Sequence, residues 1–240
     1  MTPDLSARAE DARELMDDPN ADARVLARTY EQFGLINAVV TRWHRAYRRD
    51  IRPRAIQRPL RILDVGAGGG DLPRALAGWM RRDGVAGEIT ALDADERAIR
   101  WAVDHDEQGD VIYRCALLSD LVTAGEVFDV VLSNHLLHHL DAAELPGFLA
   151  DSRSLVPAAG LVAHHDIARS AAAYRLFAAG TLPFTRNLLS GSFIREDGLT
   201  SIRRSYTASE LAALAPKGWT VRTGVPARLQ LRWEGRRAGA

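Results

Sequence analysis

The chain has 240 residues, of which 47% are apolar, and its 31 basic and 31 acidic side chains balance. This length and apolar content support one large domain, and zero net charge gives no field that selects nucleic acid or an anionic membrane as a partner. No apolar run approaches the roughly 18 residues of a membrane-spanning helix, and the acidic start lacks the apolar core of a signal peptide. Cys115 is the single cysteine, so no internal disulfide forms and a reducing cytoplasm is expected.

The first part of the chain, residues 1–59, is expected to form an N-terminal helical lid or cap. Apolar side chains recur there at spacings of three and four from Val25 to Trp43, as on one face of a helix. Arg-Pro pairs at 52–53 and 58–59 are expected to end the helix, because a residue that precedes proline avoids the helical region.

From residue 60 onward, strand-like and helix-like stretches alternate. Repeated β-α units of this kind predict a parallel sheet with helices on both faces. Two capping boxes, Asp141 with Glu144 and Thr207 with Glu210, mark the starts of two helices. The strand-like runs are 60–66, 87–94, 111–117, 128–134 and 160–167.

The alternation stops after residue 167. Residues 168–206 mix small, aromatic and arginine side chains and predict a lid insertion over the sheet. Residues 219–224 and 227–234 alternate polar and apolar positions across a Gly-Val-Pro turn, which predicts an antiparallel pair of strands. We therefore expect the main domain to run over residues 60–240.

A glycine-rich loop follows the first strand, in the sequence RILDVGAGGGD that begins at Arg61. Glycines at a strand-to-helix turn let a ligand approach the main chain, and open α/β sheets bind ligands at this edge. The loop fits neither G-x-G-x-x-G nor the phosphate-binding G-x-x-x-x-G-K-[ST]. Asp64 would repel a diphosphate but suits a cation. Asp93 ends the second strand at the spacing of a ribose-binding acid, so S-adenosylmethionine (SAM), which has a nucleoside and two cationic groups, fits the pair.

Four stretches, LDVGAGGGD, ALDADERAI, FDVVLSNHLLHHL and LVPAAGLVAHHDI, together resemble the successive motifs of class I SAM-dependent methyltransferases. They are most similar to the small-molecule branch related to quinone-biosynthesis and polyketide-tailoring methyltransferases. The resemblance covers residues 60–167, and residues 207–233 by topology. It implies an α/β, Rossmann-like, seven-stranded and mostly parallel sheet in the order 3-2-1-4-5-7-6 with strand 7 antiparallel. It also implies SAM as cofactor and S-adenosylhomocysteine (SAH) as product.

The resemblance also assigns a cofactor site. Asp64 would hold the methionine ammonium, Asp93 would accept the ribose hydroxyls, and His135 would stand at the mouth of methyl transfer. The chain departs from its relatives after the third strand, where Ala116 replaces an adenine-binding acid. Apolar packing is expected to hold the adenine instead, or Asp120 if the loop is shifted. The implied cofactor-binding residues are Asp64, Gly66, Ala67, Gly68, Asp93, Ala94, Leu117, Leu118, Asn134 and His135.

Methyl transfer from SAM is an in-line displacement, so the protein mainly aligns the reacting atoms in a dry pocket. A phenol, with a pKa of about 10, usually needs a general base. His135, His165 and Asp166 are the candidates, and alignment without a base is the alternative. His138 and His139 are expected to pack or cap. His135 and His139 have an i,i+4 spacing, but the H-E-x-x-H glutamate and a cysteine partner are missing, so no metal is expected.

Three functions are compatible with these patterns. The motifs favour O-methylation of a small aromatic or polyketide-type metabolite in secondary metabolism, with aromatic side chains of residues 1–50 and 168–206 over the acceptor. The alternative is an RNA or protein methyltransferase that uses residues 42–61, which hold eight arginines and one acid, as a phosphate track. Zero net charge weighs against it. A noncatalytic SAM-binding module is the third.

The partners follow from the same reasoning. A small-molecule acceptor is expected, and neither a membrane nor a nucleic acid is. The arginines of residues 168–206 suit a carboxylate or an acidic carrier domain. Both a monomer and a homodimer remain open.

Overall fold

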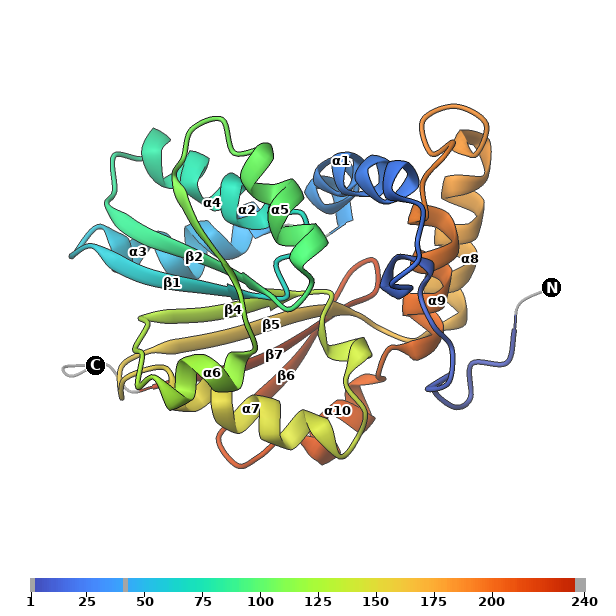
Figure 1. The fold of residues 1–240 in the computed structure, drawn as a ribbon. Coiled ribbons are helices and arrows are strands. Elements are labelled where there is room, and N and C mark those ends of the chain that lie inside the picture. Colours follow the sequence, from blue (N-terminus) through green and yellow to red (C-terminus); the bar gives the residue numbers. More distant parts are fainter. Residues whose placement is uncertain (1–2, 41–42, 236–240) are drawn as a thin grey trace.

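A computed structural model describes residues 3–40 and 43–235; the side chains of residues 35–40 lie outside this description. Its centre is a seven-stranded sheet in the order β3-β2-β1-β4-β5-β7-β6 (Figure 1). β7 is antiparallel to β5 and β6, and all other neighbours are parallel, which confirms the expected topology. The strands are β1 (Leu60–Val65), β2 (Gly87–Asp93), β3 (Val111–Cys115), β4 (Val130–Asn134), β5 (Leu161–Ile167), β6 (Thr220–Gly224) and β7 (Arg228–Glu234).

Helices cover both faces of the sheet, with α2 to α5 on one side and α6, α7 and α10 on the other (Figure 1). Both expected capping boxes are present. None of the helices in the described part of the chain is both long and apolar enough to cross a membrane. The α-helices are α1 (Ala23–Val40), α2 (Trp43–Ala46), α3 (Arg52–Ala55), α4 (Asp71–Arg82), α5 (Glu96–Asp104), α6 (Leu118–Thr123), α7 (Glu144–Ser154), α8 (Ala171–Thr181), α9 (Ile194–Arg204) and α10 (Ala208–Leu214). Short turns are η1 (Leu15–Asp17), the π-helix η2 (Tyr47–Ile51), η3 (Leu137–His139) and η4 (Leu182–Phe184).

Two apolar cores flank the sheet. Because successive strand residues point to opposite faces, Ile62 belongs to one core and Leu63 to the other. Trp43 and Tyr47 are buried in the same core as Ile62, under α4. The end of the segment 1–59 is therefore built into the body of the domain.

The helix was expected to end at the Arg-Pro pairs 52–53 and 58–59. The first pair does not end it, whereas the helix does end before the second pair. It continues as α3 to Ala55, because Pro53 lies in the first turn of α3 after a π-turn. In a first turn the missing N–H of proline would have no intrahelical partner in any case, so proline is tolerated there.

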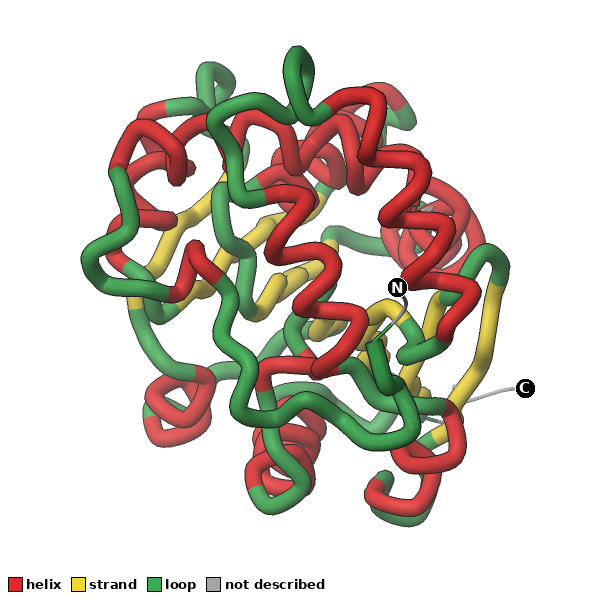
Figure 2. Tube along the Cα trace, turned by 90° about the vertical axis from the view of Figure 1, so that its right-hand side faces the viewer, coloured by secondary structure: helices red, strands yellow, loops and turns green. Residues whose placement is uncertain are grey.

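Segments that are far apart in the sequence meet beyond the carboxyl ends of the parallel strands. Residues 3–22, α1, α8 and α9 lie together there, as Figures 1 and 2 show. Arginine side chains from the rest of the chain donate hydrogen bonds to main-chain carbonyls of residues 3–22. Arg169 donates a 3.0 Å hydrogen bond to the carbonyl of Leu5, and Arg97 donates one of 3.2 Å to that of Met16. These segments roof the edge of the sheet at which a ligand is expected.

Candidate active site

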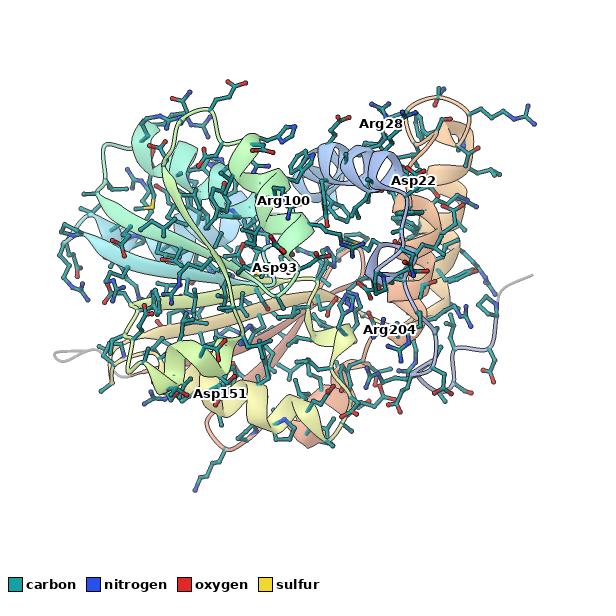
Figure 3. All side chains as sticks on the ribbon, in the orientation of Figure 1. Asp22, Arg28, Asp93, Arg100, Asp151 and Arg204 are labelled. Atoms are coloured by element: carbon teal, nitrogen blue, oxygen red, sulfur yellow. The ribbon has the colours of Figure 1, made fainter. Side chains whose placement is uncertain are left out.

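A cavity of about 840 Å³ lies between the carboxyl ends of β1, β2 and β4 and this roof. Its size is within the range of small-molecule sites, roughly 300–1,000 Å³. Figure 3 shows Asp93 at the end of the sheet that faces α9, the helix on which Arg204 lies. The residues predicted to bind the cofactor all line the cavity: Asp64, Gly66, Ala67, Gly68, Asp93, Ala94, Leu117, Leu118, Asn134 and His135.

The glycine-rich loop forms one wall of the cavity, and two of its glycines serve different purposes. Gly66 and Gly68 have φ values of 68° and 52°, a region that favours glycine. A Cβ on Gly66 would lie 2.8 Å from the Leu136 Cδ1 atom, so this glycine permits close packing. A Cβ on Gly68 would meet no protein atom within 4 Å. Gly68 therefore leaves space open on the cavity side.

Asp64 is 1% exposed, and one of its carboxylate oxygens has no hydrogen-bond partner. Burial, together with the charges of Asp71 and Asp93, raises the pKa of Asp64 well above its usual range. A buried polar group without a partner costs roughly 1–3 kcal/mol, and a donor from a ligand in the cavity would remove this cost. An ammonium group supplies both the donor and the opposite charge, so the residues present fit SAM.

This arrangement makes the stability of the ligand-free protein depend on pH at Asp64. Because the pKa is raised in the folded state, the folded protein holds the proton more tightly, and stability falls as pH rises above the unfolded value of about 4. We expect Asp64→Asn to increase the free energy of unfolding without SAM at pH 8, by up to roughly 1–3 kcal/mol. At pH 4 the difference should shrink.

Urea unfolding of both proteins at the two pH values measures this, and calorimetry should show weaker SAM binding by the variant. Equal stabilities at pH 8 would contradict the buried, unpartnered position of Asp64.

Asp93 closes the other side of the glycine loop. Its carboxylate accepts hydrogen bonds from the main-chain N–H groups of Gly68, at 2.7 Å, and Asp95, at 2.9 Å. A carboxylate offers about four acceptor positions, so two stay available for ribose hydroxyls. Asp95 instead accepts from the N–H of Arg97 and caps α5, as expected from the sequence.

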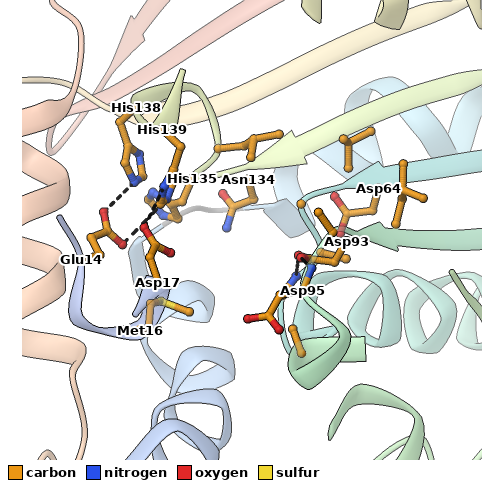
Figure 4. A pocket seen from close by; sticks show the side chains of 18 of the residues that line it. Glu14, Met16, Asp17, Asp64, Asp93, Asp95, Asn134, His135, His138 and His139 are labelled. Carbon is orange, nitrogen blue, oxygen red and sulfur yellow. Dashed lines mark hydrogen bonds and ion pairs between the residues drawn. The ribbon is translucent and has the colours of Figure 1, made fainter. Parts of the chain in front are cut away.

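The opposite end of the cavity carries histidines, with Asn134 between the two ends (Figure 4). His135 has φ of 58°, the one positive φ among the described non-glycine residues. Such strain is often found at functional sites. Its N–H donates to the carbonyl of His165 at 2.9 Å, and its ring Nδ1 lies 3.5 Å from the Asp166 carboxylate. This backbone turn places the half-exposed His135 ring on the cavity wall with a carboxylate behind it.

His138 is held between two buried carboxylates. Its Nδ1 lies 2.9 Å from Asp166, and its Nε2 lies 3.1 Å from Glu14. Burial alone would lower the pKa of His138, but the two carboxylates outweigh it and raise the pKa to about 10. The same contacts hold the pKa of Glu14 at about 2. The sequence reading missed Glu14, which is 124 residues from His138, and treated His138 as a packing residue.

The three base candidates occupy different positions. His135 lines the cavity, whereas His165 and Asp166 do not. The His165 ring stacks on Trp43 at 3.9 Å and contacts Gln230 at 2.8 Å, and burial lowers its pKa to about 3. Asp166 is 5% exposed, and its carboxylate contacts the rings of His135 and His138.

Aromatic side chains line parts of the cavity. Tyr30, Phe33 and Phe177, which were predicted to lie over the acceptor, line the cavity. Phe148 of α7 also lines it and was not predicted. The expected lid aromatics that do not line it are Trp43, Tyr47, Tyr174, Phe184 and Phe193. The first two of these belong to the core of the domain.

The arginine-rich run 42–61 contacts acids of the same chain. Arg42 lies outside the described residues. Two of the pairs are Arg52 with Asp83 at 2.7 Å and Arg61 with Glu88 at 3.2 Å. The other arginines of the run with carboxylate partners are Arg49, Arg54 and Arg58. Guanidinium groups that are already paired weigh against a phosphate track.

Comparison with known proteins identifies relatives of this part of the chain. Residues 62–160 match the family described as "Methyltransferase domain". The chain is similar to the ubiquinone biosynthesis O-methyltransferase of Mesorhizobium japonicum, at 36% identity over 105 residues that cover 43% of this chain and 39% of that protein. The protein of the same name from Ruegeria sp. is 30% identical over 161 residues, covering 64% and 62%. The chain thus spans about two fifths of the first relative and three fifths of the second.

Solved structures extend the likeness over nearly the whole chain. The plantazolicin methyltransferase BpumL in complex with SAH has a TM-score of 0.56 at 12% identity, covering 88% of this chain and 96% of its own. The DhpI–SAH complex has a TM-score of 0.50 at 19% identity, covering 90% and 100%. At such identities the likeness concerns the fold alone. Residues 62–160 are therefore a methyltransferase domain, and the chain has the class I methyltransferase fold.

Proposed function

We propose that the protein is a SAM-dependent methyltransferase that methylates an oxygen of a small aromatic or polyketide-type metabolite. One observation carries the proposal: a single cavity with mostly apolar walls joins a buried, unpartnered acid, Asp64, to the ring of His135. The acid suits the cationic methionine part of SAM. The apolar walls suit a flat, apolar acceptor. Similarity to ubiquinone biosynthesis O-methyltransferases supports the choice of oxygen as the methylated atom.

The residues have separate tasks in this proposal. SAM supplies a methyl group on a sulfonium leaving group when it is bound. Asp64 holds the methionine ammonium and Asp93 holds the ribose, and the open space at Gly68 admits the cofactor. The cavity walls hold the acceptor oxygen in line with the methyl group and exclude water.

His135 is assigned the general base. Its ring lines the cavity, and Asp166 behind it at 3.5 Å orients the ring and stabilises the imidazolium that forms. The Asp166 carboxylate stays ionised because, although burial opposes ionisation, His138 and His135 lower its pKa. Asp166 is therefore a positioning residue.

The single, exposed thiol of Cys115 supports a reducing compartment, and we propose the cytoplasm. An acidic carrier domain finds less support. Arg169, of the arginines suggested for it, is 5% exposed and is bound to Glu210 and to main-chain carbonyls.

The proposal is tested with SAM that carries a labelled methyl group. The protein is incubated with a panel of substituted phenols, with an organic extract of the source cells, and with total RNA and protein. Label in the solvent-extractable fraction, identified by mass spectrometry as a methyl ether, is the expected result. Turnover on RNA or protein alone would overturn the proposal.

At the cofactor end we expect Asp93→Asn to weaken SAH binding by roughly 1–3 kcal/mol, because the ribose hydroxyls lose a charged acceptor. Calorimetry with SAH and its 2′-deoxy and 3′-deoxy analogues separates this from a disturbed loop. The parent should discriminate against the deoxy analogues, and the variant should not. A variant that still discriminates would place the ribose elsewhere.

A further inference from the structure

The histidine end of the cavity holds a second cluster, of which the methyl-transfer proposal uses only His138, as a partner of Asp166. Glu14, His138 and His139 each offer one ligand atom, and these atoms all lie within 4.8 Å of one another. Glu14 and His138 are buried, His139 is half-buried, and all three line the cavity. They come from residues 3–22 of the roof and from η3, which follows β4 (Figure 4).

We propose that Glu14, His138 and His139 form a binding site for a divalent transition-metal ion of the zinc type. Two imidazoles and one carboxylate are the ligand types that zinc accepts. Three protein ligands leave a fourth position for water or for an oxygen of a molecule in the cavity, as in zinc sites that are not purely structural.

The ligand atoms lie close enough together to reach one ion. Ligands at about 2.0 Å from zinc stand about 3.3 Å from one another. His138 Nε2 lies 3.1 Å from Glu14 Oε1, and His139 Nε2 lies 3.8 Å from the other carboxylate oxygen, Glu14 Oε2. One ligand atom from each residue lies within 4.8 Å of the others, so the three side chains must draw closer together around a bound ion.

The contacts of the other ring nitrogen of His138 are those of a metal-bound histidine. A ligating imidazole almost always donates its other N–H to a carboxylate, which fixes the tautomer. Asp166 takes this place on His138 Nδ1 at 2.9 Å and also accepts the His138 main-chain N–H at 2.9 Å. His138 therefore presents Nε2 to Glu14, in the direction of the proposed ion.

The charges around the cluster also favour a cation. Glu14 and Asp166 are buried on either side of His138. Asp17 lies 3.4 Å from His139 Nδ1 and 3.7 Å from the Arg204 guanidinium, so its charge is partly balanced by an arginine. A bound ion would replace the proton that now joins His138 Nε2 to Glu14, and that proton would leave to solvent. Because Glu14 belongs to the roof and the histidines to η3, the ion would also fasten residues 3–22 over the cavity.

The test uses the full chain, stripped with a chelator and then dialysed against low-micromolar Zn²⁺. We expect one zinc per chain by elemental analysis, and a tetrahedral Co²⁺ absorption band when Co²⁺ replaces it. His139→Asn is the main variant, because it removes a ligand and leaves the buried His138 contacts in place. It should lower zinc affinity at least about 100-fold, beyond the 10–100-fold typical of an outer-shell change. Glu14→Gln should do the same.

Adventitious binding by surface histidines is the control. Histidines 44 and 105 are exposed and distant from the cluster in sequence, and the double variant H44N/H105N should keep one zinc per chain with parent affinity. Absence of stoichiometric zinc in the parent would overturn the proposal. So would parent affinity in a folded His139→Asn variant, or loss of the ion from H44N/H105N. None of these readouts depends on methyl transfer.

Discussion

The His135→Asn variant is expected to lose roughly 10²–10⁴-fold in kcat, the usual contribution of a positioned general base. Asparagine is chosen because it tolerates positive φ better than other side chains, so the turn at 58° is retained. The ring that takes the proton is lost, whereas the glycine loop and Asp93 are untouched. SAM affinity should therefore fall far less than kcat, although His135 is itself among the residues predicted to bind the cofactor. Single-turnover rates with labelled SAM, together with calorimetry, measure both quantities.

A structural role for His135 would give a different pattern. If the ring acts as a base, the defect should shrink along a series of phenols as the acceptor becomes more acidic, because a phenol that is already ionised needs no base. A uniform defect along the series would assign His135 to positioning. An undiminished rate would favour alignment without a base, the alternative that the sequence left open. The matched control is the variant H105N, because His105 is exposed and lies at the C-terminal end of α5.

Gly68→Val is expected to abolish measurable SAM binding, a loss of at least about 10²-fold, because the new side chain fills space that the cofactor needs. The Cβ would meet no protein atom within 4 Å, so the substitution puts its bulk into the cavity and not into the core. The cost to the fold is the strain of a branched side chain at φ of 52°, about 1–2 kcal/mol. Calorimetry with SAM and SAH measures the loss.

The strain itself is controlled by Gly109→Val. Gly109 has φ of 64°, has open space at its Cβ, and lies before β3 outside the cavity lining. Both variants should lose similar free energy of unfolding, and only Gly68→Val should lose SAM binding. Parent affinity in Gly68→Val would show that the cofactor does not lie over this loop. Equal loss in both variants would assign the effect to strain.

The sequence by itself determined the frame of this protein. Alternating apolar runs fixed the order of strands and helices, and the carboxyl ends of parallel strands meet at one edge by geometry. Asp64, the glycine loop and Asp93 each end or follow a buried strand, so their meeting at one cavity follows from local patterns. The prediction at Pro53 failed because helix-breaking depends on where in a helix the proline falls, and that depends on packing.

The tertiary structure decided what side chains do where segments distant in sequence meet. The strand register turns His165 onto Trp43, while a single positive φ turns His135 onto the cavity wall. Spacing along the chain could not reveal Glu14 as the partner of His138, because the contact joins residues 124 apart through the docking of the roof. Periodicity reports which face of an element is apolar. Which polar groups meet, and hence which are paired, strained or available to a ligand, is settled only when the elements pack.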